Sequence, residues 1–430
     1  MRYQKIENTL FIQNRERLKK QLLPNSIAVF NSNDVLPTNA DGTMPFKQNN
    51  DLFYLTGIEQ EETILLLFPD SPDKNFKEVL FIRDINEDLT TWEGSKLTPI
   101  EASDISGIKV IRFVSEFDKL FNYLMGDAVN VYLNTNEHKR STSEVETRDD
   151  RFIKKCKSKY PLHNYIRVAP VMYRLRTIKS DIEISLLKKA CELTEKGFRR
   201  VLKFVKPGVS EAEVEAEFIH EFIRNNGAPA DYDPIIASGI DSCTLHYIKN
   251  NKVCKAGDVL LIDFAASYAN YNADMTRTIP VNGKFTRRQK QVYNAVLRVQ
   301  RRTRKLMVKG KLLFTLFEET RRLIEKELVD LKLLTTKDIK NQDPEKPASF
   351  KYYPHNVSHF LGLDVHDVGY FHEPLKPGMV LTCEPGIYIR EEGFGIRLEN
   401  NILITNKGNI DLFENIPIEA DEIEKLMNKK

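Results

Sequence analysis

The sequence predicts a mixed α/β protein in which a smaller α/β domain precedes a larger α+β domain. Its 430 residues are enough for two separate cores. The first third alternates short apolar β-rich runs with helical patterns, which is typical of a domain built on a central sheet. The remainder opens with amphipathic helices and continues with hairpin-like strand pairs, so a second architecture begins there.

In the first domain, the apolar runs predict the strands and the intervening polar segments predict turns or helices. A helix is expected over 115–124, where SEFDKLFNYL has helical spacing, and NYIRVAPVMYRLR at 164–176 reads as a further strand. After this segment the short β-rich runs give way to amphipathic helical patterns, which places the domain boundary near residue 172 and gives domains 1–172 and 173–430. The expected strands lie at 26–31, 62–68, 78–82, 108–114 and 128–133.

In the second domain, three capping boxes predict where helices begin. A hydroxyl residue is followed three positions later by Glu or Gln in Ser180–Glu183, Ser210–Glu213 and Thr286–Gln289. Between the helices, VLLIDFA at 259–265 and YNADMTRTI at 271–279 flank a short turn and are expected to pair as antiparallel strands.

Composition and charge exclude several classes of protein. Lys and Arg total 64 against 61 Asp and Glu, so net charge indicates neither nucleic-acid nor membrane binding, and the basic run at 298–305 is interpreted as a solvated helix face. No stretch approaches the ~20 apolar residues that span a bilayer. The first twenty residues lack the apolar core of a secretory signal. Five cysteines without a CxxC pair favour reduced thiols in a cytoplasmic protein.

Four carboxylates and one histidine in the last 170 residues form the main functional signal. Oxygen-rich ligands with one imidazole suit two hard divalent cations, whose charge four carboxylates would balance. Asp263 interrupts an apolar run, and a buried carboxylate needs a partner or a metal; a buried salt bridge is the alternative for this residue taken alone. The five candidate ligands are Asp263, Asp274, His359, Glu384 and Glu399.

The surrounding residues narrow the chemistry. His355, His359 and His366 are close in sequence, but Gly362 and the β-rich LDVHDV argue against one continuous helix, and the absence of HExxH argues against a single-zinc protease. Glu384 is expected at a strand end before a turn. Arg397 and Glu399 would share one face of a strand, so Arg397 could orient a metal-ligating carboxylate or form a plain salt bridge.

At these motifs the chain resembles the metallopeptidase clan of aminopeptidase P, prolidase and methionine aminopeptidase. The strings VLLIDFA, YNADMTRT, HNVSHFLGLDVHDVG, LTCEPGIY and GFGIRLEN occur in the order of the family. The resemblance implies a C-terminal pita-bread fold. FKQNNDLFYLTG at 46–57 is similar to the N-terminal domain of aminopeptidase P, which would be the smaller creatinase/prolidase-type domain.

The resemblance also implies residue roles. Asp263 would chelate one metal, Asp274 and Glu399 would bridge both, and His359 and Glu384 would complete the other shell. The metals would be two divalent ions, with Mn²⁺ favoured; ligand chemistry alone permits Mn²⁺, Co²⁺ or Fe²⁺. A metal-bridging hydroxide would attack the carbonyl, with Glu384 as proton shuttle. The residues expected near the substrate are His246, His355, His366, Tyr388 and Arg176, of which His246 and His366 would stabilise the oxyanion.

The implied activity is hydrolysis of the N-terminal Xaa-Pro bond of proline-containing peptides with a free N-terminus. Prolidase, an Xaa-Pro dipeptidase, is the alternative. The short connection between EPGIY and GIRLEN favours longer peptides, and the first 172 residues argue against methionine aminopeptidase. A non-catalytic pita-bread binding protein is a further alternative, opposed by the presence of all five ligands.

The resemblance further implies a homo-oligomer, dimer or tetramer, in which N-terminal segments cap a neighbour's active site. Trp92, the only tryptophan, is hypothesised to shape substrate access in this way. An ordinary buried or interface tryptophan is the alternative.

Overall fold

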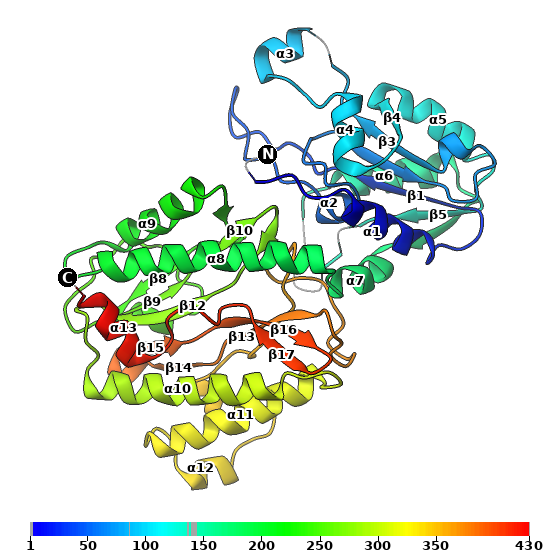
Figure 1. The fold of residues 1–430 in the computed structure, drawn as a ribbon. Helices are drawn as coiled ribbons and strands as arrows, with labels where there is room; N and C mark the ends of the chain where they lie inside the picture. The colour runs from blue at the N-terminus through cyan, green and yellow to red at the C-terminus, as the bar shows by residue number, and fades with distance from the viewer. Residues whose placement is uncertain (1–2, 86, 136, 139–143, 430) are drawn as a thin grey trace. The chain divides into compact units, whose positions relative to one another are not determined.

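The chain folds into two compact units, Tyr3–Arg176 and Thr177–Lys430. The computed structural model describes residues 3–85, 87–135, 137–138 and 144–429 (Figure 1). In this described part of the chain, no helix combines the length and the apolar composition that crossing a membrane requires.

A six-stranded mixed sheet forms the centre of the first unit, in the order β4-β3-β2-β1-β5-β6. β2 pairs antiparallel with β1 and β3, whereas β1–β5, β3–β4 and β5–β6 are parallel. All five expected strand regions form strands of this sheet, and the expected helix 115–124 is confirmed as α5. The strands are β1 Ser26–Asn31, β2 Ile64–Leu67, β3 Glu78–Ile82, β4 Val110–Phe113, β5 Asn130–Leu133 and β6 Asn164–Arg167.

The helices of the first unit begin and end at recognisable signals. α2 starts where the Asn49 side chain accepts hydrogen bonds from the backbone N–H groups of Asp51 and Leu52, and it ends at Gly57 with φ +70°. A Cβ at Gly57 would lie 2.4 Å from the Phe11 ring, so the motif 46–57 requires glycine here for both conformation and space. The helices are α1 Thr9–Lys19, α2 Asn50–Thr56, α3 Glu87–Glu93, α4 Pro99–Ser106, α5 Phe117–Leu124, α6 Arg148–Lys159 and α7 Ala169–Thr177.

One expected strand is wrong over most of its length. Only Asn164–Arg167 of the segment 164–176 is a strand, and Ala169–Thr177 is helix α7. Met172, Leu175 and Arg176 are buried, which is helical spacing. The β-branched residues near the start of the segment concealed this change of period.

Trp92 lies on α3 with 86% of its surface exposed. The alternative of an ordinary buried tryptophan is therefore wrong for this chain taken by itself.

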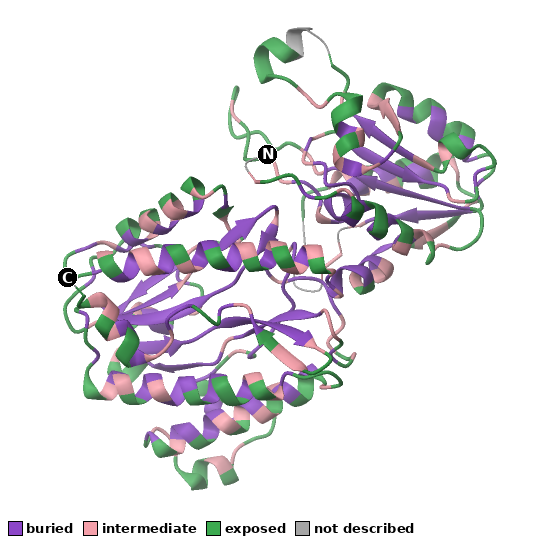
Figure 2. Cartoon of the chain, viewed as in Figure 1, coloured by how far each residue is buried: buried purple, intermediate pink, exposed green. Residues whose placement is uncertain are grey.

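The second unit consists of small antiparallel sheets between two pairs of helices. Figure 1 shows α8 and α9 on one side of the strands and α10 and α11 on the other, and Figure 2 shows the strands buried while the outward faces of the helices are exposed. The sheets have the orders β12-β9-β8, β11-β10-β7, β13-β16-β17 and β14-β15. The helices are α8 Asp181–Phe204, α9 Glu211–Arg224, α10 Arg287–Leu306, α11 Leu313–Asp330, α12 Thr336–Lys340 and α13 Ala420–Met427.

All three predicted capping boxes are confirmed. In α8, α9 and α10 the hydroxyl of the first motif residue accepts from the backbone of the fourth, whose side chain accepts from the backbone of the first. The strands of this unit are β7 Ala228–Pro229, β8 Ile235–Ser238, β9 Val259–Asp263, β10 Ala266–Tyr268, β11 Tyr271–Asn272, β12 Thr276–Pro280, β13 Val380–Cys383, β14 Gly386–Ile389, β15 Phe394–Arg397, β16 Asn400–Thr405 and β17 Gly408–Asp411.

The predicted antiparallel pairing around Asp263 is confirmed, with one difference. β9 pairs with β12 so that Asp263 lies opposite Thr276, but the hairpin β10–β11 is inserted between them. Asp274 therefore lies two residues before β12 rather than on it. Glu399 similarly lies between β15 and β16, so it does not share a strand with Arg397 as expected.

Candidate metal centre

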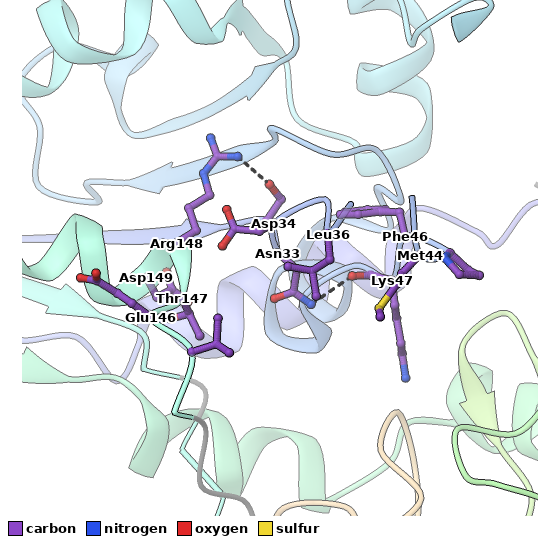
Figure 3. Close-up of a pocket in the computed structure, with 13 residues that line it drawn as sticks. Asn33, Asp34, Leu36, Met44, Phe46, Lys47, Glu146, Thr147, Arg148 and Asp149 are labelled. Carbon is purple, nitrogen blue, oxygen red and sulfur yellow. Dashed lines mark hydrogen bonds between the residues drawn. The ribbon is translucent and has the colours of Figure 1, made fainter. Parts of the chain in front are cut away.

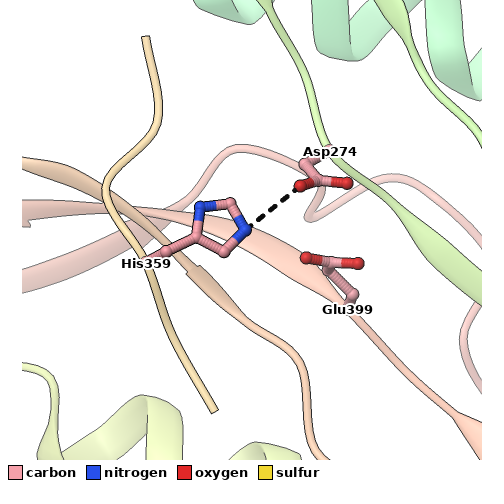
Figure 4. A group of neighbouring side chains, drawn as sticks. All are labelled: Asp274, His359 and Glu399. Carbon is pink, nitrogen blue, oxygen red and sulfur yellow. Dashed lines mark ion pairs between the residues drawn. The ribbon is translucent and has the colours of Figure 1, made fainter. Parts of the chain in front are cut away.

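Three of the five predicted ligands form a compact buried group. One ligand atom each from Asp274, His359 and Glu399 lies within 4.8 Å of the others, the one such group in the part of the chain that the structure describes. Figure 4 shows the three side chains pointing toward one another from separate segments. The His359 Nε2 atom is 3.3 Å from Asp274 Oδ2.

The other two predicted ligands border this group. Glu384 follows the last residue of β13, as predicted, and its Oε1 is 3.6 Å from His359 Nε2. Asp263 ends β9, opposite Thr276 of β12, and the nearby charge of Asp274 acts on its pKa. Its Oδ1 is buried without a hydrogen-bond partner. The structure thus brings all five residues together from five segments.

Burial and mutual repulsion disfavour the charged forms of these carboxylates. Burial raises the pKa of Glu384 to about 7, and the charges of Asp274 and Asp263 add to the effect. Burial and the neighbouring carboxylates likewise raise the pKa of Glu399 well above its ordinary value, and burial raises that of Asp263. Bound cations would offset this repulsion, so the residues fit a metal centre.

His359 presents one nitrogen to the carboxylates. Its Nδ1 is 2.9 Å from the carbonyl oxygen of Phe360; because a carbonyl can only accept, Nδ1 carries a proton and Nε2 faces Asp274 and Glu384. Burial alone would lower the pKa of His359, but the hydrogen bond to Asp274 and the charge of Glu384 outweigh it, and the pKa is raised.

Arg397 connects several of these groups. Its guanidinium donates to Asp263 Oδ2 at 2.7 Å, to Thr276 Oγ1 at 3.0 Å and to the Tyr388 hydroxyl at 3.0 Å. Thr276 Oγ1 in turn donates to Glu399 Oε2 at 2.7 Å. Both strands of the β9–β12 pair and the β14–β15 hairpin are therefore fixed to one arginine, which orients two candidate ligands.

Sequence reasoning missed the residues that support the ligands. Thr382 Oγ1 donates to Glu384 Oε1 at 3.1 Å, and Thr276 supports Glu399. The Asn401 side chain bonds both the N–H and the carbonyl of Asp274, at 3.1 Å and 2.6 Å. The sequence does contain one signal for these supporting residues: a threonine two positions from a candidate ligand, as in Asp274–Thr276 and Thr382–Glu384.

His366 and His355 lie beside the ligand group. The His366 ring stacks on that of His359, with centroids 4.0 Å apart and planes at 29°. His355 Nε2 accepts from the Tyr388 hydroxyl at 2.8 Å, and its Nδ1 donates to the Asn356 carbonyl at 2.8 Å. Burial, with the charge of Arg397, lowers the pKa of His355 to about 3, so this imidazole is neutral.

A buried ion pair of Asp367, the residue after His366, holds the loop that carries His366. Lys179 Nζ is 2.9 Å from Asp367 Oδ2, and both side chains are 1% exposed. Gly362 leaves the space for this pair, because a Cβ there would lie 2.2 Å from Asp367 Oδ2. No sequence motif predicts this ion pair.

His246 and Arg176 have different positions. His246 is exposed on the loop after the 3-10 turn Gly239–Cys243, and hydrogen bonds from Arg390 and Gly395 attach the start of this loop to the β14–β15 hairpin of the site. Arg176 belongs to the first unit, where its guanidinium is 2.9 Å from Asp51 Oδ1. Its predicted role at the substrate stays a prediction.

The first unit contains a separate cleft of about 310 Å³ with mixed charge. Arg148 donates to Ser32 Oγ at 3.1 Å and Asn33 donates to the Lys47 carbonyl at 3.0 Å along its wall (Figure 3). Its apolar lining comes from Leu36, Met44, Pro45, Phe46 and Val145. Among the described residues, this cleft holds no group of side chains comparable to the metal centre.

The sequence matches two family models. Residues 185–406 match metallopeptidase family M24, and residues 11–132 match the aminopeptidase P N-terminal domain. The chain belongs to metallopeptidase family M24. Its enzyme class, a metallopeptidase, and the predicted resemblance to aminopeptidase P are thereby confirmed.

Relatives of this M24 metallopeptidase match it over nearly its whole length. Xaa-Pro aminopeptidase of Haemophilus influenzae is 33% identical, covering 99% of this chain and 98% of that protein, and the Escherichia coli Xaa-Pro aminopeptidase is 33% identical, covering 97% of each. A zinc-substituted E. coli aminopeptidase P in complex with product has a TM-score of 0.89 at 31% identity, covering 99% of this chain and 100% of that one. Pseudomonas aeruginosa aminopeptidase PepP has a TM-score of 0.89 at 28% identity, covering 98% of each chain. The predicted architecture, a pita-bread domain preceded by an aminopeptidase P-type domain, is confirmed.

Proposed function

We propose that this chain is a dinuclear-metal Xaa-Pro aminopeptidase, which hydrolyses the bond before proline at the N-terminus of a peptide. The observation that carries the proposal is the convergence of four carboxylates and one imidazole in a chain whose near full-length relatives are Xaa-Pro aminopeptidases. A binding protein without catalysis would have no need to bring such a costly group of carboxylates together.

Two divalent cations would be held by the five candidate ligands Asp263, Asp274, His359, Glu384 and Glu399. Four carboxylates and one imidazole favour hard or borderline ions, and Mn²⁺ is the proposed metal. The zinc-substituted form of the E. coli relative supports a divalent metal in this family without selecting one. When bound, the two cations would supply an activated water and polarise the scissile carbonyl.

The chain's own residues would bind and orient the peptide and move the proton. His246 and His366 would donate hydrogen bonds to the carbonyl oxygen as negative charge develops on it. Glu384 would take up the proton of the attacking water and pass it to the proline nitrogen. His355, neutral because it is buried and hydrogen-bonded to the Tyr388 hydroxyl, would line the pocket, and Arg397 would keep Asp263 in place.

Peptide length distinguishes aminopeptidase P from prolidase. With Mn²⁺ present, we expect release of alanine from the tripeptide Ala-Pro-Ala at a rate well above that from the dipeptide Ala-Pro, measured by chromatography of the products. Cleavage of the dipeptide alone would make the chain a prolidase. A protein inert toward both would be a binding protein.

The oligomer is part of the same proposal. If a second copy uses Trp92 to limit peptide access, Trp92→Ala should change the ratio of tripeptide to hexapeptide cleavage by about 10-fold, since one large aromatic contact contributes about 1–2 kcal/mol. Leu162→Ala, which also truncates an exposed apolar side chain of the first unit, is the control. An unchanged ratio for Trp92→Ala would remove Trp92 from the proposal.

We also propose a reducing, cytoplasmic location. All five cysteines are free and buried. Cys383 directs its sulfur toward the Gln300 carbonyl at 3.7 Å, so this thiol next to Glu384 is a packed side chain.

A further inference from the structure

Glu211 is a buried carboxylate that the proposed mechanism leaves unused. It is the first residue of α9 and is 0% exposed. Four donors surround it: Oε1 accepts from the Ser238 N–H at 2.9 Å and the Ser238 hydroxyl at 2.7 Å, and Oε2 accepts from the Tyr247 hydroxyl at 2.8 Å and the Lys252 N–H at 3.0 Å. A buried carboxylate costs several kcal/mol unless it is compensated in this way, so the arrangement requires an explanation.

The four donors bracket the loop that carries His246. Ser238 ends β8, and the loop begins after it. At the other end of the loop, Lys252 contacts the first residue of α9, because the Glu211 N–H donates to the Lys252 carbonyl at 2.9 Å. Tyr247 directly follows His246 and is 6% exposed, whereas His246 is exposed. The carboxylate therefore fixes both ends of the loop and the residue next to the imidazole.

Other contacts hold the loop against the strands of the site. Arg390 donates to the Cys243 carbonyl at 2.9 Å, and the Gly395 N–H donates to the Ser242 hydroxyl at 2.7 Å. These bonds attach the first half of the loop to the β14–β15 hairpin, which carries Tyr388 and Arg397. The second half, with His246, is held by Glu211 and by Asn250, whose side chain bonds Ile236 and Pro234. Leu245 and Tyr247 also pack against the hydrophobic cluster that includes Tyr388.

We propose that Glu211 positions His246 for the substrate carbonyl, by holding the backbone of Ser238, Tyr247 and Lys252 to one buried carboxylate. This inference rests on the proposed function, because it assigns Glu211 to the same reaction. All four donors are satisfied only if both side-chain atoms at the end of residue 211 accept hydrogen bonds, as the two oxygens of a carboxylate do. Glutamine at this position would turn an N–H₂ group toward either Ser238 or Lys252, whose backbone N–H groups cannot accept, so one end of the loop would be released.

A double-mutant cycle tests this positioning role. We expect Glu211→Gln to lower kcat for Ala-Pro-Ala by about 30- to 100-fold, since a displacement of about 1 Å of a catalytic group has an effect of that size. In a His246→Ala background the same substitution should change kcat by less than about 3-fold, because the group that it positions is already gone. Glu213→Gln is the matched control on the same helix; it is exposed, and Gln serves equally in its capping box.

A second measurement does not depend on activity. In protein loaded with diamagnetic Zn²⁺ in place of Mn²⁺, the imidazole NMR signal of His246, assigned by its loss in His246→Ala, should broaden or split in Glu211→Gln while the signals of His355 and His359 keep their positions. If Glu211→Gln does not fold, Tyr247→Phe removes one donor and should give a smaller change of the same kind. Effects on kcat that multiply in the double variant, or an unchanged His246 signal, would overturn the inference. A wild-type protein inactive on Ala-Pro-Ala with the NMR change present would instead overturn the proposed function alone.

Discussion

Glu384→Gln should lower kcat for Ala-Pro-Ala by about 10²- to 10⁴-fold, the usual contribution of a general acid–base group. The Glu384 carboxylate lies between His359, 3.6 Å from its Oε1, and His355, 3.9 Å from its Oε2. Glutamine keeps the shape and the hydrogen bond from Thr382, but it cannot take up and release a proton near pH 7. Single-turnover rates at saturating Mn²⁺ measure the loss, since one weakened ligand lowers metal affinity as well.

The control for this variant is Glu345→Gln, which removes one carboxylate charge from an exposed position of the same unit and should keep wild-type rates. Metal content measured on the same samples separates the two possible causes of inactivity. A Glu384→Gln enzyme that binds two metal ions and retains more than a tenth of wild-type kcat would refute the role of Glu384 in proton transfer.

Local sequence signals predicted much of the fold because they act within a few residues. The capping boxes at Ser180, Ser210 and Thr286 mark helix starts that need only their own side chains. The strand expected over 164–176 is wrong after Arg167 because the apolar residues from Val168 to Met172 suit either period, and burial against the rest of the unit selects the helix.

The sequence predicts the candidate metal ligands but not the residues that hydrogen-bond to them or position the site. Carboxylates within apolar runs, such as Asp263, are costly in isolation and therefore conspicuous. Thr276, Thr382 and Glu211 are ordinary at their positions in the sequence, and their roles arise from contacts made across strands and loops. The position of Asp274 just outside a strand has the same origin, since the inserted β10–β11 hairpin sets where pairing resumes.

Removal of the metal should make the stability of this protein depend steeply on pH. The folded-state pKa of Glu384 is about 7 against an ordinary value of 4.5, because of burial first and then of neighbouring carboxylates. A carboxyl group whose pKa is raised on folding contributes stability below its unfolded value and loses it as pH rises through the folded value. The metal-free protein should therefore lose on the order of 2–3 kcal/mol of unfolding free energy between about pH 5 and pH 8 from Glu384 alone.

The other titratable groups of the site decide the pH range in which this loss of unfolding free energy is best measured. The pKa values of Asp263, Glu399 and His359 are also raised, so they act in the same direction. His355 acts oppositely: burial lowers its pKa from 6.5 to about 3, so its contribution is present above 6.5 and is lost only as pH falls. Urea unfolding of chelated protein between about pH 6.5 and 8 thus avoids the opposing contribution of His355, which is neutral in both states over most of that range.

Mn²⁺ should reverse this dependence. The cations bind the ionised carboxylates, so at about pH 8 a Mn²⁺ concentration about 100 times Kd should restore about 3 kcal/mol, and the gain should shrink toward pH 6 as protons compete. Chelated Glu384→Gln should show a flatter pH dependence than the wild type, while Glu345→Gln should not differ from it. Equal slopes for chelated wild type and Glu384→Gln would mean that Glu384 ionises normally in the folded protein, and the buried like-charge cluster would then not be what the cations relieve.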